Sequence, residues 1–229
     1  MNHPGLKIFA AWGGFFYILL FSIAWLFLMR IVPGHDPSAD AAAIAGLYHE
    51  HHVGITLGCI LLLFSCFFLS LYGAVLVKLM EKAEQGFGVL SLSTLIAVAM
   101  GVVITMLAAV FWGTAAFRPE RAPELIQTLN DLAWLSFFST APPIFMMFAS
   151  VALVALLGDK ALPIFPRWYG YLNLWVLVAI IPGVLALLLK TGPFAWDGLI
   201  VYWMGAVTFV TTLAISPKVV VPAVKKHLI

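Results

Sequence analysis

Residues 53–77 read VGITLGCILLLFSCFFLSLYGAVLV, a run without a charged side chain. A helix needs about 20 mostly apolar residues to cross the hydrocarbon core of a bilayer, and this run supplies them. Other stretches of similar length also have interiors free of Asp, Glu, Lys, Arg and His. The six predicted spans are 8–30, 53–77, 88–116, 132–157, 168–189 and 198–216. The sequence therefore predicts an all-α helical bundle that forms a single transmembrane domain.

The composition of the 229-residue chain supports the same conclusion, since 63% of its residues are hydrophobic and 10% are charged. Soluble domains carry about 25% charged residues, so a chain this apolar lacks the polar surface that water requires. The lipid bilayer is therefore the first predicted partner. A formal net charge of +2 gives no reason to expect a nucleic-acid partner.

The distribution of Lys and Arg predicts the orientation, because these residues gather on the cytoplasmic side of membrane proteins. Alternating spans place both termini and the connections 78–87 and 158–167 on one side, where basic residues outnumber acidic ones. The basic residues of this side are Lys7, Lys78, Lys82, Lys160, Arg167, Lys218, Lys225 and Lys226. On the other side acidic residues outnumber basic ones. We therefore predict a multi-pass protein of the bacterial inner membrane with both termini in the cytoplasm.

The two longer outer connections are predicted to contain short amphipathic helices. Residues 38–48 are rich in Ala and begin with Ser38, a residue type that caps helix N-termini. Residues 119–131 begin with Pro119 and place apolar side chains at helical spacing against acidic and polar ones. We expect both helices to lie on the outer surface of the membrane.

The outer connections also contain the densest group of potential metal ligands, His49-Glu50-His51-His52. His49 and His52 are three residues apart and would share one face of a helix. Imidazole and carboxylate groups bind transition metals, and Asp131 is predicted to lie on the same outer side. A transition metal held by His49, His52 and Asp131 is one interpretation. The alternatives are a solvated helix start at the histidines and an ion pair of Asp131 with Arg118 or Arg121.

Pro142 and Pro143 lie near the middle of the span predicted over 132–157, after three hydroxyl residues. Proline removes a backbone donor and clashes with the preceding turn, so we expect the helix to break there. A second kink is expected at Pro182-Gly183 in the next span. Broken helices in membranes often border binding sites, because their free carbonyl groups need polar partners. The predicted ligand-binding residues are Ser136, Ser139, Thr140, Pro142, Pro143 and Asn173.

Two of these features have structural alternatives. The kink in span 132–157 also suits simple helix packing with no ligand. Asn173 is a polar residue inside span 168–189, and a buried amide usually forms a hydrogen bond to a neighbouring helix. Gly54 and Gly58 form a G-x-x-x-G step, which predicts the close approach of another helix without identifying it.

No span interior contains an ionisable residue, although such residues mark proton relays and ion paths in membranes. The sequence also has no phosphate-binding glycine loop and no recognisable nucleophile–base pair. We therefore expect a non-enzymatic protein that binds or passes a small apolar or amphipathic molecule through the kinked fourth and fifth spans. The alternatives are an accessory or metal-bearing subunit of a membrane oxidoreductase, and a structural subunit of a membrane assembly or homo-oligomer.

Four segments carry a resemblance to known proteins. They are Phe117-Arg-Pro-Glu-Arg121, Leu129-Asn-Asp-Leu-Ala-Trp134, Phe165-Pro-Arg-Trp168 with Gly170-Tyr-Leu-Asn173, and Lys190-Thr-Gly-Pro-Phe-Ala-Trp196. Together they resemble a group of bacterial polytopic membrane proteins of similar length, found in actinobacteria and proteobacteria. The resemblance implies a membrane protein and brings no substrate, cofactor or catalytic residue. The histidine cluster is not part of it.

Overall fold

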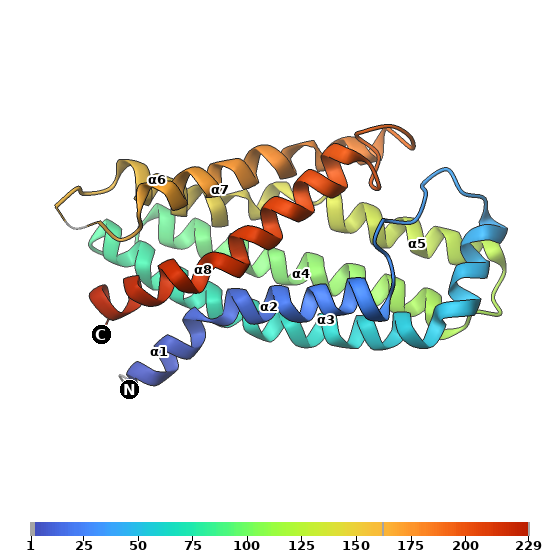
Figure 1. The fold of residues 1–229 in the computed structure, drawn as a ribbon, viewed down its shortest axis with the longest axis horizontal. Helices are drawn as coiled ribbons and strands as arrows, with labels where there is room; N and C mark the ends of the chain where they lie inside the picture. The colour runs from blue at the N-terminus through green and yellow to red at the C-terminus, as the bar shows by residue number, and fades with distance from the viewer. Residues whose placement is uncertain (1–2, 162, 229) are drawn as a thin grey trace.

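A computed structural model describes residues 3–161 and 163–228, and these residues form a bundle of long helices without strands. Figure 1 shows the helices running along the long axis of the molecule. Six of them are long and apolar enough to cross a membrane, which supports a multi-pass membrane protein. The prediction of an all-α chain with six potential spans is confirmed.

Several spans are built from more than one helical segment. Span 1 contains α1 (Pro4–Ala11), α2 (Gly13–Ile23) and the π-helical η1 (Ala24–Leu28); span 2 is α3 (Ala41–Glu84); and span 3 is α4 (Val89–Phe117). Span 4 contains α5 (Pro123–Phe138), the 3-10 turn η2 (Pro142–Ile144) and α6 (Phe145–Leu157). Span 5 contains α7 (Arg167–Ile180) and the 3-10 helix η3 (Ile181–Leu187), and span 6 contains the π-helical η4 (Leu199–Met204) and α8 (Gly205–His227).

Both ends of the chain lie at the same end of the bundle, which we call the terminal end (Figure 1). The Lys7 ammonium group donates a hydrogen bond to the carbonyl of Leu228 at 2.6 Å, which joins the first span to the last. The opposite end, called the distal end, holds the segment 29–40, the turn 118–122 and the connection 188–198. An even number of crossings produces this arrangement.

The helices reach beyond the predicted boundaries at the distal end. Residues 41–48 are the first turns of α3, and residues 123–131 are the first turns of α5, so neither is a separate helix. In Figure 1 the first turns of α3 stand at a steep angle to the rest of that helix. Their position on a membrane surface stays a prediction.

The predicted N-cap at Ser38 is wrong. The cap of α3 is Asp40, whose carboxylate accepts a hydrogen bond from the Ala43 amide at 2.8 Å. Ser38 is held elsewhere, because its amide and its hydroxyl both donate to the Asp36 carboxylate, at 2.8 and 2.6 Å. A carboxylate is the stronger acceptor, and Asp36 therefore binds Ser38 in a local turn before the helix begins.

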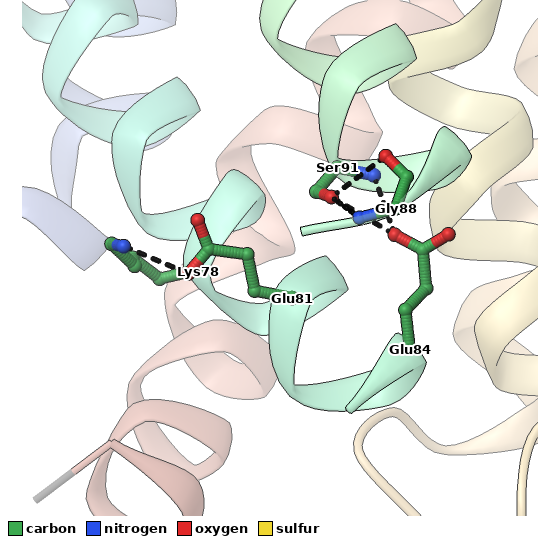
Figure 2. Close-up of polar contacts among 5 residues, drawn as sticks. All are labelled: Lys78, Glu81, Glu84, Gly88 and Ser91. Carbon is green, nitrogen blue, oxygen red and sulfur yellow. Dashed lines mark hydrogen bonds and ion pairs between the residues drawn. The ribbon is translucent and has the colours of Figure 1, made fainter. Parts of the chain in front are cut away.

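A short turn with a capping carboxylate joins α3 to α4 (Figure 2). Glu84, the last residue of α3, accepts hydrogen bonds from the amides of Leu90 and Ser91, each at 2.9 Å. These amides belong to the first turn of α4, where helix amides have no partner within the helix. The Ser91 hydroxyl accepts from the Gly88 amide at 2.8 Å. The carboxylate of one helix thus fixes the start of the next.

Close contact between spans 1 and 2 explains the G-x-x-x-G step. A Cβ atom at Gly54 would collide with the Leu28 carbonyl oxygen, and one at Gly58 would collide with the Met29 side chain. The predicted close approach of a helix at these two glycines is confirmed, and the helix belongs to the same chain. The two glycines are therefore used inside the bundle and do not form a free face for another subunit.

Candidate functional site

A cavity of about 360 Å³ lies inside the bundle, within the size range of small-molecule sites. All six spans contribute to its wall, span 2 through Leu69, and most of the wall is aromatic or aliphatic. Phe21, Trp25, Phe137, Phe138 and Tyr202 form its aromatic side. These rings also contact one another, with Trp25 stacked on Tyr202 at a centroid distance of 5.9 Å. The lining favours an apolar occupant.

The cavity lies where four spans depart from α-helical geometry. The segments η1, η2, η3 and η4 each place residues in its wall, among them Trp25, Ile144, Gly183 and Tyr202. Each departure frees or misaligns backbone groups that an ideal helix would pair. In a membrane such backbone is tolerated where it is buried in protein or borders a cavity. The convergence of the four segments on one space marks it as the candidate site.

The breaks in spans 4 and 5 meet each other, and the two predicted kinks are confirmed. Pro142 and Pro143 have no amide hydrogen to offer the carbonyls of Phe138 and Ser139 four residues earlier. A Cβ atom at Gly183 would lie 2.6 Å from the Phe138 carbonyl oxygen, so only glycine allows this approach. The Ser139 hydroxyl donates to the Gly183 carbonyl at 3.4 Å. The broken turns therefore pack directly against each other at the edge of the cavity.

The side chains predicted to contact a ligand lie beside the cavity. The Ser136 hydroxyl donates to the Ala133 carbonyl at 3.0 Å, and the Thr140 hydroxyl donates to the Ser136 carbonyl. The wall at this level is made by their neighbours Phe137, Phe138, Ala141 and Ile144. The predicted hydroxyl groups thus satisfy backbone carbonyls around the break. Their contact with a ligand stays a prediction.

Asn173 lies apart from the other predicted ligand residues. It is buried on α7, and its amide group donates to the Tyr169 carbonyl one turn earlier at 2.7 Å. Tyr169 in turn packs toward α3, with its hydroxyl 3.4 Å from that of Tyr72. Asn173 is not among the residues that line the cavity. The structure therefore does not bring Asn173 together with the break in span 4.

The cavity wall has one polar pair that the sequence analysis missed, Tyr17 and Thr105. Their hydroxyl oxygens lie 3.0 Å apart, and both side chains are buried. Thr105 donates its single proton to the Gly101 carbonyl at 3.0 Å. Tyr17 is therefore the donor to Thr105, and the Tyr17 oxygen keeps lone pairs that can accept a hydrogen bond. In the sequence, this pair could have been suspected because a tyrosine and a threonine each lie in the middle of an otherwise apolar span.

Trp25 of the aromatic wall packs against two further tryptophans that do not line the cavity. Trp25, Trp112 and Trp134 come from three different spans and meet edge to face, with centroid distances of 5.0–5.9 Å. Their indole N–H groups are buried and have no conventional hydrogen-bond acceptor. Edge-to-face contact sets the positive edge of one indole against the negative face of the next, which offsets part of this cost. The cluster makes a rigid support for the wall.

A polar network closes the distal end of the bundle above the tryptophans. The Asn130 side-chain oxygen accepts from the Tyr48 hydroxyl at 3.1 Å and lies 3.0 Å from the His35 Nδ1 atom. Since an amide oxygen is an acceptor, His35 carries its proton on Nδ1. Burial lowers the pKa of His35, and its hydrogen bond to Asn130 opposes that shift in part. The imidazole is therefore neutral near pH 7.

The network also attaches the segment 29–40 to the last two spans. The Trp196 indole donates to the His35 carbonyl at 2.7 Å, and the Tyr202 hydroxyl donates to the Ile31 carbonyl at 2.7 Å. The Gln127 amide donates to the Ala39 carbonyl at 3.0 Å. Residues from spans 4 and 6 and the connection between spans 5 and 6 thus hold this extended segment across the distal end.

The predicted metal ligands are not gathered around one point. Within residues 3–161 and 163–228, no group of three or more His, Cys, Asp or Glu side chains is placed to hold a metal ion. The His52 Nδ1 atom lies 3.0 Å from the His49 carbonyl oxygen, and Asp131 accepts a long 3.5 Å hydrogen bond from Asn130. Arg121, a predicted partner of Asp131, donates instead to the Thr114 carbonyl at 2.8 Å.

Comparisons of the chain with protein-family models, with curated proteins and with solved structures found no match.

Proposed function

We propose that this protein binds a small, uncharged, apolar or amphipathic molecule in the cavity between its broken spans. The observation that carries the proposal is the convergence of η1, η2, η3 and η4 on one mostly apolar space. Irregular backbone costs free energy of folding, and four irregular segments around one space are typical of a functional site. The proposed role is ligand binding without a chemical step.

The size and chemistry of the space define the ligand class. At about 30 Å³ for each water-sized group, a volume of about 360 Å³ accommodates roughly a dozen such groups. An ionised ligand would face a wall without a counter-charge, at a cost of several kcal/mol. The free acceptor on Tyr17 suits a ligand with one hydroxyl group. A medium-chain alcohol, a phenol or a small terpenoid alcohol satisfies these requirements.

The proposed location is the bacterial inner membrane, with both termini in the cytoplasm. The excess of Lys and Arg on the terminal end supports this orientation, because positive charge is retained on the cytoplasmic side. Reporter fusions placed after residue 85 and within the segment 29–40 test it. Cytoplasmic activity of the first fusion and periplasmic activity of the second are expected, and the reverse pattern would contradict the orientation.

Ligand-dependent thermal stabilisation of the purified protein tests the binding proposal. A panel of neutral alcohols and phenols is compared with fatty acids and alkyl ammonium ions of matched length. A neutral ligand at 100 times its Kd is expected to stabilise the fold by about 2.7 kcal/mol, which raises Tm by several degrees. Charged analogues are expected to have no effect. Equal stabilisation by all members of the panel would indicate a detergent-like effect and contradict a specific site.

Two substitutions on α4 and α8 supply matched variants for this assay. A Cβ atom at Gly205 would have its nearest neighbour 3.9 Å away, so Gly205→Leu places a side chain in the cavity without a backbone collision. Leu107→Phe adds bulk at an exposed position on α4, outside the cavity. We expect Gly205→Leu to abolish ligand stabilisation and Leu107→Phe to preserve it. Preserved stabilisation in Gly205→Leu would mean that the ligand binds elsewhere.

A further inference from the structure

The wall between spans 1 and 6 differs along its length. Near the terminal end the two spans touch, since a Cβ atom at Gly14 would lie 2.8 Å from the Ser216 hydroxyl oxygen. Figure 1 shows α8 lying close to the start of α2 and diverging from it toward the distal end.

The cavity reaches the surface of the molecule between spans 1 and 6. Three residues that line it are also exposed large hydrophobic residues: Leu26 of span 1 is 49% exposed, and Trp203 and Val207 of span 6 are 40% and 59% exposed. An exposed residue that also lines a cavity marks its mouth. We call these three residues the lateral mouth. They lie on the side of the bundle, between two spans, where hydrocarbon surrounds a membrane protein.

At the distal end the segment 29–40 lies across the bundle, held by spans 4 and 6, and its Val32 forms part of the cavity wall. The hydrogen bond from Tyr202 to the Ile31 carbonyl joins span 6 to this segment. The bond from Trp196 to the His35 carbonyl lies further out and holds the same segment. Ile31 and Met29 beside it are fully buried. A ligand arriving from water would have to displace this segment.

We infer that the ligand enters and leaves the cavity sideways, from the hydrocarbon of the bilayer through the lateral mouth, and is therefore a molecule that partitions into membranes. This inference rests on the proposed function and adds the route and the source of the ligand. The apolar side chains of the mouth match the acyl chains outside, so a neutral ligand crosses without exposure to water. The hydrogen-bonded segment 29–40 keeps the distal side shut during this passage.

Stopped-flow quenching of tryptophan fluorescence tests the route, with ω-bromoundecanol as the probe. The bromine atom quenches indoles in contact with it, and Trp25 lines the cavity. The full chain is reconstituted in phosphatidylcholine vesicles and mixed with vesicles that carry the probe. A saturable quenching phase that is reduced in Trp25→Phe and lost when Trp203→Phe is added reports occupation of the cavity, since both indoles line it. Quenching of indoles exposed to lipid is proportional to the probe concentration and is subtracted.

Substitutions at the mouth are expected to change the rate and not the extent of quenching. The double variant Leu26→Phe, Val207→Phe narrows the mouth and should slow the saturable phase roughly tenfold. Association rates among variants of one site vary over a range that includes this change. Leu26→Ala with Val207→Ala widens the mouth and should accelerate the phase. Because the two pairs change the rate in opposite directions, general damage to the fold does not produce the expected result. Leu92→Phe, on the exposed face of α4, is the matched control.

The competing route from water is tested with Trp196→Phe, which removes the hydrogen bond to the His35 carbonyl and leaves the mouth unchanged. Lateral entry predicts an unchanged rate in this variant. A faster rate in Trp196→Phe, or equal rates in the narrowed and widened variants, would overturn the lateral route while the binding proposal stands. Absence of any saturable phase in the unsubstituted protein would instead overturn the binding proposal itself.

Discussion

Gln85 shows how a single residue carries strain at the end of a long helix. It caps α3 in the left-handed conformation, with φ of 56°, and its amide donates to the Glu81 carbonyl. An L-residue other than Gly, Asn or Asp pays about 1–2 kcal/mol for this conformation. The position therefore suits glycine, the usual residue after the last turn of a helix.

Gln85→Gly is expected to stabilise the protein by about 1 kcal/mol, because the backbone conformation would no longer be strained. Thermal unfolding followed by intrinsic fluorescence measures the change. Gln85→Ala is the control, since its Cβ atom keeps the strain, and no stabilisation is expected there. A Tm that rises equally in both variants would show that loss of the glutamine side chain, rather than relief of strain, is responsible.

Tyr17 is the second residue whose chemistry leads to a specific prediction. Its oxygen accepts from the ligand in the proposed complex, so Tyr17→Phe should weaken binding of ω-bromoundecanol roughly fivefold, the equivalent of about 1 kcal/mol. Binding of bromoundecane, which has no hydroxyl group, should not change. Thermal stabilisation titrations with both compounds measure the two affinities. An equal loss for both would indicate a change in cavity shape instead of a lost hydrogen bond.

At the scale of whole elements, the helix ends depend on a few polar side chains. Glu84 joins two spans by accepting from amides in the first turn of α4. Glu84→Ala should therefore destabilise the protein by about 1–2 kcal/mol, the usual effect of losing a cap. The matched control is Glu81→Ala, three residues earlier, which removes the exposed ion pair with Lys78 seen in Figure 2 and should cost no more than about 0.5 kcal/mol. Thermal unfolding measures the loss of stability in both variants. Equal losses of stability would show that Glu84 does not act as a helix cap.

The segment 29–40 is an element whose attachment should depend on pH. Burial lowers the pKa of His35 in the folded protein, so in the window below about 6.5 the unfolded chain binds more protons than the folded one. Stability then rises with pH through this window, and the contribution of the neutral His35 is lost as the pH falls. His51 is close enough to add to the lowering of the pKa, and the Asn130 amide lies between His35 and Asp131.

His35→Gln tests this dependence, because glutamine keeps a hydrogen-bond donor and does not titrate near neutral pH. We expect the Tm of the unsubstituted protein to fall between pH 7.5 and pH 5 by more than that of His35→Gln. Parallel pH profiles for the two proteins would show that other groups account for the acid sensitivity. Circular dichroism at each pH confirms that both proteins are helical before heating.

At the scale of the whole molecule, the predictions that succeeded depend on local sequence. Hydropathy predicted the six spans because each span must be apolar over its own length. The kinks at Pro142 and Pro182 were predictable because proline removes a backbone donor and clashes with the preceding turn, although Pro217 and Pro222 lie within α8 without ending it. The ends of the spans could not be predicted in the same way. The helices α3 and α5 begin in connections that are Ala-rich or amphipathic, so the helix continues across the boundary that hydropathy predicted.

The cavity could not be predicted from the sequence because contacts between residues far apart in the chain form it. Tyr17 and Thr105 are separated by 88 positions, and nothing local connects them. The hydroxyl groups beside Pro142 were expected in the site, yet they bond to nearby carbonyls, and aromatic neighbours face the cavity. The histidines at 49 and 52 share a helix face as expected, but a metal site needs a third ligand from another element, and sequence spacing does not supply it.

Gly183 lies where the packing of spans 4 and 5 leaves no room for a methyl group. Its hydrogen atom lies where the Phe138 carbonyl allows nothing larger, so Gly183→Ala would force the proline turns of two spans apart. The cavity would then become larger beside Gly183, and the side chains of the lateral mouth would not change. If the proposed ligand binds there, Gly183→Ala is expected to admit larger ligands through an unchanged mouth, so the absence of one carbon atom at this position would limit ligand size.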